Sequence, residues 1–202
     1  MKNNSMYTKI EIRNQIRQKK RAMTQEEIEE KSKKIWENLR STKEFMEAEL
    51  LYMYVSYNQE VMTRPYIKEC IFKGKKVAVP KIIDGSMEFL QIEDMKQLEK
   101  GYQGILEPIR GRLICGEPGL MLMPGLAFDK SLHRCGYGGG FYDTYLQKYD
   151  KGNLIKFALA YKYQIFEKIP VEKHDKILDA IVTEDEVVRR MKVAHNSESA
   201  YI

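Results

Sequence analysis

The sequence predicts an α/β protein with a three-layer αβα architecture and a mainly parallel central sheet. Short apolar stretches such as "AELLYMYVSY" and "GLMLMPG" have the composition of buried strands. They alternate along the chain with segments whose apolar residues keep helical spacing. This alternation is typical of sheets covered by helices on both faces, and ligands bind beyond the carboxyl ends of such strands.

The first segment predicts a helix with an unusual charge pattern. Lys9, Arg13, Arg17 and Arg21 recur every four residues, so they form one cationic stripe. Residues 1–40 hold eleven of the 34 Lys and Arg and six of the 29 Asp and Glu, so the net charge of +5 lies in this part of the chain. Such a local excess indicates an anion near this end rather than a uniformly basic surface.

Cap and turn residues locate the next helices. Thr24 and Glu27 have the spacing of a capping box and predict the start of a second helix. Its predicted packed face consists of Ile28, Ser32, Ile35, Trp36 and Leu39. In "TRPYIKECIFKG", Pro65 suits the first turn of a helix and Gly74 suits its end.

The rest of the chain predicts further strands, one loop and two helices. The predicted strands are "KKVAVPKII", "MEFLQI", "LIKFALAY" and "DAIVT". Residues 101–119 are rich in Gly and Pro and are predicted to be loop. A helix is expected to continue through "FYDTYLQKY", and Thr183 with Glu186 predicts the cap of a last helix. We expect a single domain over residues 1–202, with a polar, frayed end after Ala194.

Composition points to a cytoplasmic protein. Hydrophobic residues make up 43% and charged residues 31%, which excludes wholesale disorder. No run approaches the roughly 20 apolar residues of a membrane span, and the N-terminus lacks the apolar stretch of a secretory signal. The three widely spaced cysteines fit a reducing compartment better than a disulfide framework. We expect no membrane or nucleic-acid partner and a monomeric protein.

The stretch "RCGYGGGFYD" carries the strongest functional signal. Four glycines between residues 136 and 140 let backbone N–H groups approach an anion, and a helix that starts there adds a favourable dipole. Arg134 offers a cationic fork for phosphate, and Asp143 could hold a divalent ion. A tight turn with two charged neighbours explains the same residues without a ligand. The loop matches neither a Walker A sequence nor the G-x-G-x-x-G fingerprint.

Four blocks of the sequence resemble, in order, the 5-formyltetrahydrofolate cyclo-ligase (methenyltetrahydrofolate synthetase) family. The blocks are "KIEIRNQIRQKKRAMTQEE", "YVSYNQEVMT", "LMLMPGLAFDKSLHRCGYGGGFYDTYL" and "QIFEKIPVEKHDKILDAIVTE", which together extend over most of the chain. The resemblance implies an enzyme that uses ATP and magnesium to cyclise 5-formyltetrahydrofolate to 5,10-methenyltetrahydrofolate, with release of ADP and phosphate. Such an enzyme must position two reactants and stabilise a migrating phosphoryl group.

The resemblance implies that ATP contacts the first helix and the glycine loop. Lys9 and Arg13 match the family's paired N-terminal cations, and Lys9 and Arg134 are the expected catalytic residues. The expected ATP-binding residues of the loop are Arg134, Cys135, Gly136, Tyr137, Gly138, Gly139, Gly140, Phe141 and Tyr142. Without a ligand, Lys9 and Arg13 would be a solvated basic face. Arg17 and Arg21 have no match in the family pattern and are interpreted as surface charge.

The resemblance also implies a magnesium site. Asp143 and Asp175 match the family's magnesium-associated carboxylates, and magnesium commonly takes one or two protein carboxylates together with phosphate oxygens and water. These aspartates are far apart in sequence, so only the fold can bring them together. Without a metal, Asp143 would be an ordinary charge in the first turn of a helix, and Asp175 would cap a loop.

Val55 and Glu60 match the family's folate-contacting positions. A carboxylate can accept two parallel hydrogen bonds from the pterin, although Glu60 could instead carry an ordinary first-turn charge for the following helix. Tyr137 or Phe141 is expected against the flat pterin ring, with core packing as the alternative. Phe141 stands where many members of the family have tyrosine, and Cys135 stands where leucine or methionine is common.

Other functions fit the sequence less well. A folate-binding relative without turnover is one alternative, because Phe141 lacks the hydroxyl that many members have. A nucleic-acid-binding protein that uses the basic first helix is another, but it leaves the glycine loop unexplained. His133 and Cys135 have no second Cys/His pair at zinc-ligand spacing, and no G-x-S-x-G elbow indicates a hydrolase.

Overall fold

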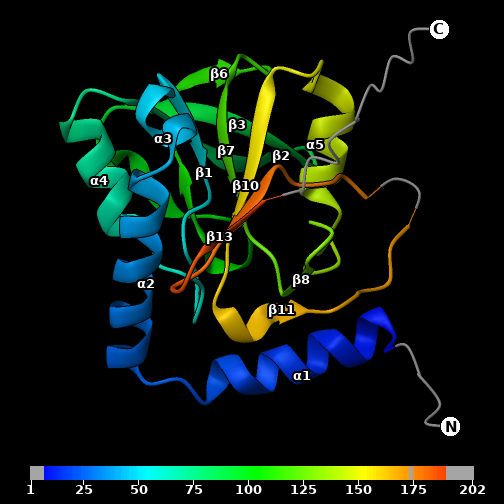
Figure 1. The fold of residues 1–202 in the computed structure, drawn as a ribbon. Helices are drawn as coiled ribbons and strands as arrows, with labels where there is room; N and C mark the ends of the chain where they lie inside the picture. Colours follow the sequence, from blue (N-terminus) through cyan, green and yellow to red (C-terminus); the bar gives the residue numbers. More distant parts are fainter. Residues whose placement is uncertain (1–6, 173–174, 190–202) are drawn as a thin grey trace, which may run out of the picture.

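The computed structural model has a mixed sheet with helices on both faces (Figure 1). It describes residues 7–172 and 175–189, and the predicted tail after Ala194 lies outside these ranges. Within them the largest sheet has eight strands, in the spatial order β13 (Val187–Arg189), β12 (Ala180–Val182), β10 (Leu154–Leu159), β7 (Gly119–Met123), β1 (Leu50–Met53), β2 (Lys76–Ile83), β3 (Ser86–Ile92) and β6 (Arg112–Ile114). The strands from β12 to β2 are mutually parallel, and β13, β3 and β6 add antiparallel edges. The predicted αβα class with a mainly parallel sheet is confirmed.

The sheet buries side chains on both faces because alternate residues of a strand point to opposite sides. In β1, Leu51 and Met53 pack against one helix layer, whereas Leu50 and Tyr52 pack against the other. The first layer consists of α2 (Gln25–Arg40), α3 (Lys43–Glu47) and α4 (Arg64–Phe72), and the second contains α5 (Phe141–Tyr149). Figure 1 shows these layers on opposite sides of the strands.

The first helix, α1 (Lys9–Arg21), covers neither face of the sheet and lies below it in Figure 1. Its fully buried residues Ile12 and Ile16 pack in a separate apolar cluster that includes Leu126 and Cys135. Two of its buried residues, Ala127 and Cys135, belong to a small second sheet of β11 (Ile165–Phe166), β8 (Ala127–Asp129) and β9 (Arg134–Cys135). The glycine loop that follows β9 is thereby brought beside α1.

The cap and turn residues predicted for α2 and α4 are confirmed. The Thr24 hydroxyl accepts a hydrogen bond from the Glu27 backbone N–H at 3.2 Å, and the Glu27 carboxylate accepts one from the Thr24 N–H at 2.8 Å. The five residues predicted for the packed face of α2 are all buried. Pro65 lies in the first turn of α4, and Gly74 adopts a left-handed φ of +81° after its end.

Part of the predicted loop at residues 101–119 is regular structure, so this prediction was wrong. A hairpin consists of β4 (Leu98–Lys100) and β5 (Leu106–Pro108), and β6 pairs with β3 at the edge of the main sheet. Single 3-10 turns occur at η1 (Met95–Gln97), η2 (Tyr102–Gly104) and η3 (Lys162–Gln164). Three-residue strands are stabilised by partners elsewhere in the fold, so they leave too little periodicity in the sequence to be predicted.

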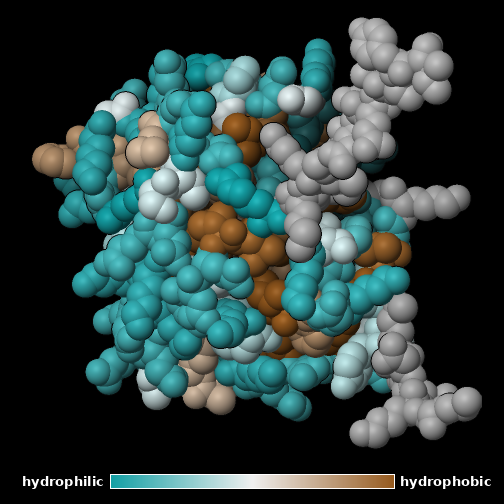
Figure 2. Space-filling model, viewed as in Figure 1, coloured by the Kyte–Doolittle hydropathy of each residue, from teal (hydrophilic) through white to brown (hydrophobic). Residues whose placement is uncertain are grey.

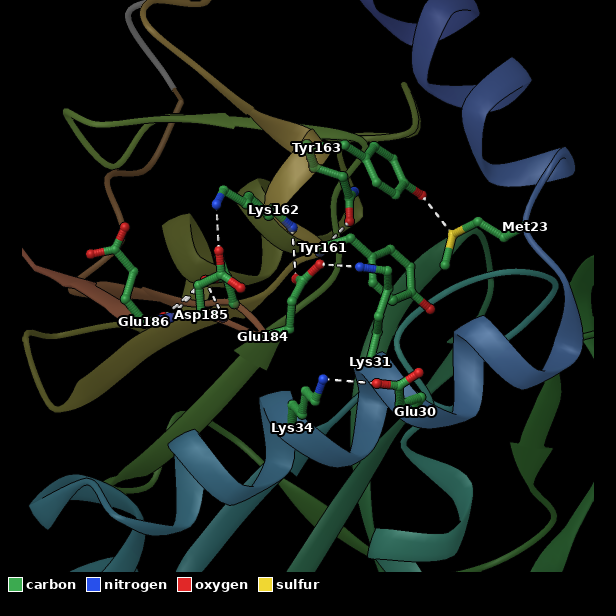
Figure 3. A network of polar contacts seen from close by, with 12 residues as sticks. Met23, Glu30, Lys31, Lys34, Tyr161, Lys162, Tyr163, Glu184, Asp185 and Glu186 are labelled. Carbon is green, nitrogen blue, oxygen red and sulfur yellow. Dashed lines mark hydrogen bonds and ion pairs between the residues drawn. The ribbon is translucent and has the colours of Figure 1, made fainter.

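The predicted last helix after Thr183 was also wrong. The Thr183 hydroxyl accepts hydrogen bonds from the N–H groups of Asp185 and Glu186, and the Thr183 N–H donates to the Glu186 carbonyl at 2.9 Å. The chain therefore turns back into β13, because Ser and Thr side chains cap turns as readily as helices. Figure 3 shows this turn tied to α2, where Lys31 Nζ donates to Glu184 at 2.7 Å.

The outer surfaces of α1 and α2 are hydrophilic in Figure 2, and hydrophobic atoms gather towards the middle of the same view. This pattern agrees with the burial of only one stripe of each helix. Among the residues that the structure describes, no helix has the length and apolarity needed to cross a membrane.

Candidate functional site

A cavity of about 480 Å³ lies at the carboxyl ends of β1 and β7, where ligands of parallel sheets are expected. Val55, just after β1, and Pro124, just after β7, line its floor. Its other walls come from α1, the β4–β5 hairpin, and the glycine loop with the first turn of α5. The predicted loop residues therefore meet the predicted folate-contacting residues in one cavity.

The glycine loop forms the N-terminal end of α5. Gly140 is the N-cap residue with φ +66°, and Gly138 has φ +114°, so both use backbone conformations that other residues rarely adopt. A Cβ at Gly139 would come within 2.9 Å of the Phe141 ring. The loop thus follows a path that glycine allows and ends at the first-turn N–H groups of a helix, which is a suitable arrangement for an anion.

Arg134 is buried at the centre of this site. One of its guanidinium nitrogens donates to the Asp143 carboxylate at 2.6 Å, and the other donates to the Pro124 carbonyl at 3.2 Å. Its Nε and the Tyr142 hydroxyl are buried, and neither has a hydrogen-bond partner among the described residues. Because buried polar atoms are normally paired, Arg134 and Tyr142 each keep hydrogen-bonding capacity that the described part of the chain does not use.

The N-terminal cations reach the loop and the C-terminal segment. Lys9 Nζ donates to Asp175 at 2.8 Å and to Glu172 at 2.9 Å, whereas Arg13 Nε donates to the Gly136 carbonyl at 3.0 Å. Burial opposes the charge of Lys9, but its bonds to the two carboxylates outweigh this effect and raise the pKa of Lys9 above its ordinary value. The i, i+4 register of Lys9 and Arg13 therefore directs both towards the glycine loop and the C-terminal segment, but Lys9, Arg13 and Asp175 do not line the cavity itself.

The two predicted metal-binding aspartates belong to neighbouring segments. Asp143 Oδ1 accepts a hydrogen bond of 3.4 Å from the backbone N–H of Lys176, the residue after Asp175. Within the described ranges there is no group of three or more His, Cys, Asp or Glu side chains that could hold a metal ion by itself. One or two carboxylates nevertheless suit a hard cation that takes its remaining ligands from phosphate and water.

The remaining wall of the cavity is aromatic. Phe141 lies edge-on to Tyr102 of the hairpin, with 5.9 Å between ring centroids. Glu60 accepts a hydrogen bond from the Tyr57 backbone N–H at 2.9 Å. Tyr137 is 42% exposed as a whole residue, but its hydroxyl end is enclosed, and this enclosure, followed by the nearby Glu60 carboxylate, raises the pKa of Tyr137 well above its ordinary value. Flat apolar surfaces beside one carboxylate are suited to an aromatic heterocycle with N–H donors.

Cys135 differs from its neighbours in the loop. Its side chain is buried in the apolar cluster beneath α1 with Ile12 and Ile16, and it does not line the cavity. Burial raises the pKa of the Cys135 thiol, which further disfavours the reactive thiolate. Its expected contact with ATP is therefore limited to the backbone.

Some lining residues were missed by sequence reasoning. Arg17 and Arg21 are exposed but also line the cavity, so their interpretation as surface charge was incomplete. The recurrence of basic residues every four positions, from Lys9 to Arg21, was the sequence signal that could have placed them at the cavity. Lys20 lies on another face of α1, where its spacing of four residues from Ile16 was a signal that was missed, and Tyr102 comes from the region predicted to be loop.

The geometry agrees with comparisons to known proteins. A sequence model described as the 5-formyltetrahydrofolate cyclo-ligase family matches residues 5–184. The chain belongs to this family.

Two members of the cyclo-ligase family and one solved structure illustrate the similarity. The 5-formyltetrahydrofolate cyclo-ligase of Mus musculus is 30% identical over 187 residues, which cover 86% of this chain and 92% of the mouse protein. The Escherichia coli (strain K12) enzyme is 30% identical over 178 residues, which cover 85% of this chain and 98% of that protein. The NMR structure of Aquifex aeolicus 5,10-methenyltetrahydrofolate synthetase is 30% identical, has a TM-score of 0.82, and aligns over 95% of this chain and 99% of its own.

Proposed function

We propose that this protein cyclises 5-formyltetrahydrofolate to 5,10-methenyltetrahydrofolate with ATP and magnesium, releasing ADP and phosphate. Membership of the cyclo-ligase family supports the reaction. The observation that carries it is the convergence of three distant segments: Arg13 contacts Gly136, Lys9 contacts Asp175, and Asp143 contacts Lys176. Anion-binding groups and an aromatic cavity thus meet at one place, as a reaction between a nucleotide and a folate requires.

The reaction has two bond-forming steps. The formyl oxygen of the folate attacks the γ-phosphorus of ATP, the bond to ADP breaks, and an activated iminium phosphate results. The arylamine nitrogen then attacks the iminium carbon and loses its proton to water, and the carbon–oxygen bond breaks with loss of phosphate. The chain needs no nucleophile of its own, so catalysis consists of positioning and of stabilising charge on the transferred phosphoryl group.

The nucleotide side of the site comprises Lys9, Arg13, Arg134, Asp143 and Asp175. We assign Lys9 and Arg13 to the polyphosphate and Arg134 to the transferred phosphoryl group, with the loop N–H groups as further donors. Lys9 and Arg134 are each paired with an aspartate, so phosphate must compete with these carboxylates. The carboxylates that the two basic groups release, Asp175 and Asp143, are the same two that would hold a cation.

Magnesium fits this side. Asp143 and Asp175 would hold it, as their segments touch through the hydrogen bond from the Lys176 N–H to Asp143. When bound, the ion would shield phosphate charge and polarise the phosphoryl oxygens.

The folate side comprises Val55, Glu60, Tyr137 and Phe141. We assign Glu60 to the N–H groups of the pterin, and Phe141 to an aromatic contact with its ring. Val55 supplies apolar floor next to them. We also propose that one domain carries both sides, and that the protein acts in the cytoplasm as a monomer without nucleic-acid or membrane partners.

One assay tests the proposal. Purified protein is mixed with 5-formyltetrahydrofolate and magnesium, and the ultraviolet absorbance of the methenyl product is followed with and without ATP. We expect absorbance to rise only with ATP, with one ADP formed for each product molecule. Folate binding without product would instead identify a non-catalytic relative, and salt-sensitive binding of nucleic acid alone would identify the other alternative.

A further inference from the structure

Lys20 occupies a position of α1 where an apolar residue is expected. Ile12, Ile16 and Lys20 recur every four residues and form the buried stripe of the helix, and Lys20 is only 6% exposed. Burial lowers the pKa of Lys20, partly offset by the Glu60 charge. A lysine at such a position weakens the folded state unless it serves another purpose, because its charge is removed from water.

The ammonium group of Lys20 contacts the glycine loop. Its Nζ donates to the Tyr137 hydroxyl at 2.9 Å and lies 5.4 Å from the centre of that ring. The described residues provide Lys20 with no ion pair at salt-bridge distance, so the phenol is its direct partner. The Tyr137 hydroxyl accepts from Lys20 and keeps its own proton, and the Glu60 carboxylate lies close enough to raise the pKa of Tyr137. A cation, a phenol and a carboxylate therefore follow one another along the cavity wall.

This arrangement restrains the most adaptable part of the site. Tyr137 stands between Gly136 and Gly138, so its backbone has little intrinsic preference for one conformation. From the same helix, Arg13 holds the Gly136 carbonyl and Lys20 holds the next side chain. Together they fix both the path of the loop and the direction of its aromatic ring.

We propose that Lys20 is a positioning residue for the folate: by donating to the Tyr137 hydroxyl it fixes this ring beside Glu60 and so prepares the folate side of the cavity. The inference rests on the proposed function. Lys20 touches neither reacting atom in this scheme, so its loss weakens folate binding more than it slows turnover. Preorganisation of this kind lowers the ordering cost of binding.

Two single variants and their combination test the proposal. Lys20→Met keeps a long apolar side chain in the buried stripe and removes the donor, and Tyr137→Phe removes the acceptor. We expect each to raise KM for 5-formyltetrahydrofolate about tenfold, while KM for ATP stays within about twofold. The combination should be no worse than either single variant, because both remove the same contact. We expect Tm of Lys20→Met to equal or exceed that of the unmodified chain, since a buried charge is removed.

The controls separate this inference from the proposed function. Lys33→Met replaces an exposed lysine of α2 and should leave all constants unchanged. If the unmodified chain forms no methenyl product, the proposed function fails. If it turns over normally and Lys20→Met keeps its folate KM, or if the double variant shows the product of the two single effects, the role of Lys20 is refuted. A fall in Tm that parallels the rise in KM would also refute it, because it would indicate simple structural damage.

Discussion

The two sides of the cavity are stabilised by different means. On the proposed nucleotide side, the charged groups are paired with one another: Arg134 with Asp143 in the lining of the cavity, and Lys9 with Asp175 outside that lining. On the folate side, Phe141 and Tyr102 form a wall through ring contacts. The charged side must therefore exchange partners to accept a ligand, whereas the aromatic side offers a surface that is already formed. Substitutions on the charged side should accordingly affect kcat and the requirement for ATP or magnesium. Substitutions on the aromatic side should affect only the affinity for folate.

The largest effect is expected at Arg134. In Arg134→Lys the charge remains but the fork to Asp143 and Pro124 is lost, and we expect kcat to fall about 100- to 1000-fold. Steady-state kinetics with a thermal melt provides the measurement. Arg112→Lys is the matched control, because Arg112 also pairs with a carboxylate but on the surface. A variant of Arg134 with nearly normal kcat would remove this residue from the phosphoryl site.

Asp143→Asn should have the next largest effect. The amide retains an acceptor for Arg134 but is a poor ligand for magnesium, so we expect kcat to fall about 10- to 100-fold and more magnesium to be needed for the half-maximal rate. Titration with magnesium at saturating substrates checks this, with folate KM determined in parallel. Asp150→Asn, at the opposite end of α5, serves as control. An unchanged magnesium requirement would mean that Asp143 only orients Arg134.

Lys9→Met should act mainly on ATP. Loss of one phosphate contact is expected to raise KM for ATP about tenfold, with KM for folate unchanged. Initial rates at varied concentrations of each substrate give both constants. Equal changes in the two constants would contradict the division of the cavity into two sides.

Phe141→Leu should act only on the folate side. An aromatic contact contributes about 0.5–1.5 kcal/mol beyond buried area, so we expect KM for folate to rise roughly two- to tenfold and kcat to change little. Phe72→Leu, on the exposed face of α4, is the control. A comparable change in KM for ATP would show that Phe141 contacts the nucleotide instead.

The smallest effect concerns pH and stability. Because the pKa of Lys20 is lowered in the folded protein, its charge destabilises the fold at neutral pH, and this cost disappears as pH rises through the lowered value towards 10.5. The stability gained by Lys20→Met should therefore be largest near neutrality and should shrink at alkaline pH. Urea unfolding of the unmodified chain and of Lys20→Met at several pH values gives the difference between their free energies of unfolding. Groups that titrate in both proteins contribute equally and cancel in this difference. A difference that does not change with pH would contradict a pKa of Lys20 that is lowered in the folded protein.

Much of this molecule could be predicted from sequence, but unevenly. The capping box at Thr24 and the stripe from Lys9 to Arg21 are local patterns, and they correctly located α1 and α2. The same kind of pattern failed at Thr183, because a hydroxyl that binds backbone N–H groups can begin a turn as well as a helix.

The site shows the same limit. The glycine loop and its flanking charges are visible in the sequence, and the family resemblance relates them to Lys9 and Asp175. The partners of Lys20 and Tyr102 are recognisable only after folding, because they are distant in the chain. Lys20 also breaks the apolar pattern of its helix face, and such departures from local rules are most informative at functional sites.

The contacts of α1 also constrain when the enzyme can become competent. Arg13 contacts Gly136, which lies 123 positions further along the chain, and Lys20 contacts Tyr137, which lies 117 positions further along. Lys9 contacts Asp175, at a separation of 166 positions. A growing chain therefore displays its basic first helix long before the ribosome has delivered the groups that neutralise it. Contacts of such high sequence separation are slow to form, so catalytic competence should be among the last properties acquired during folding.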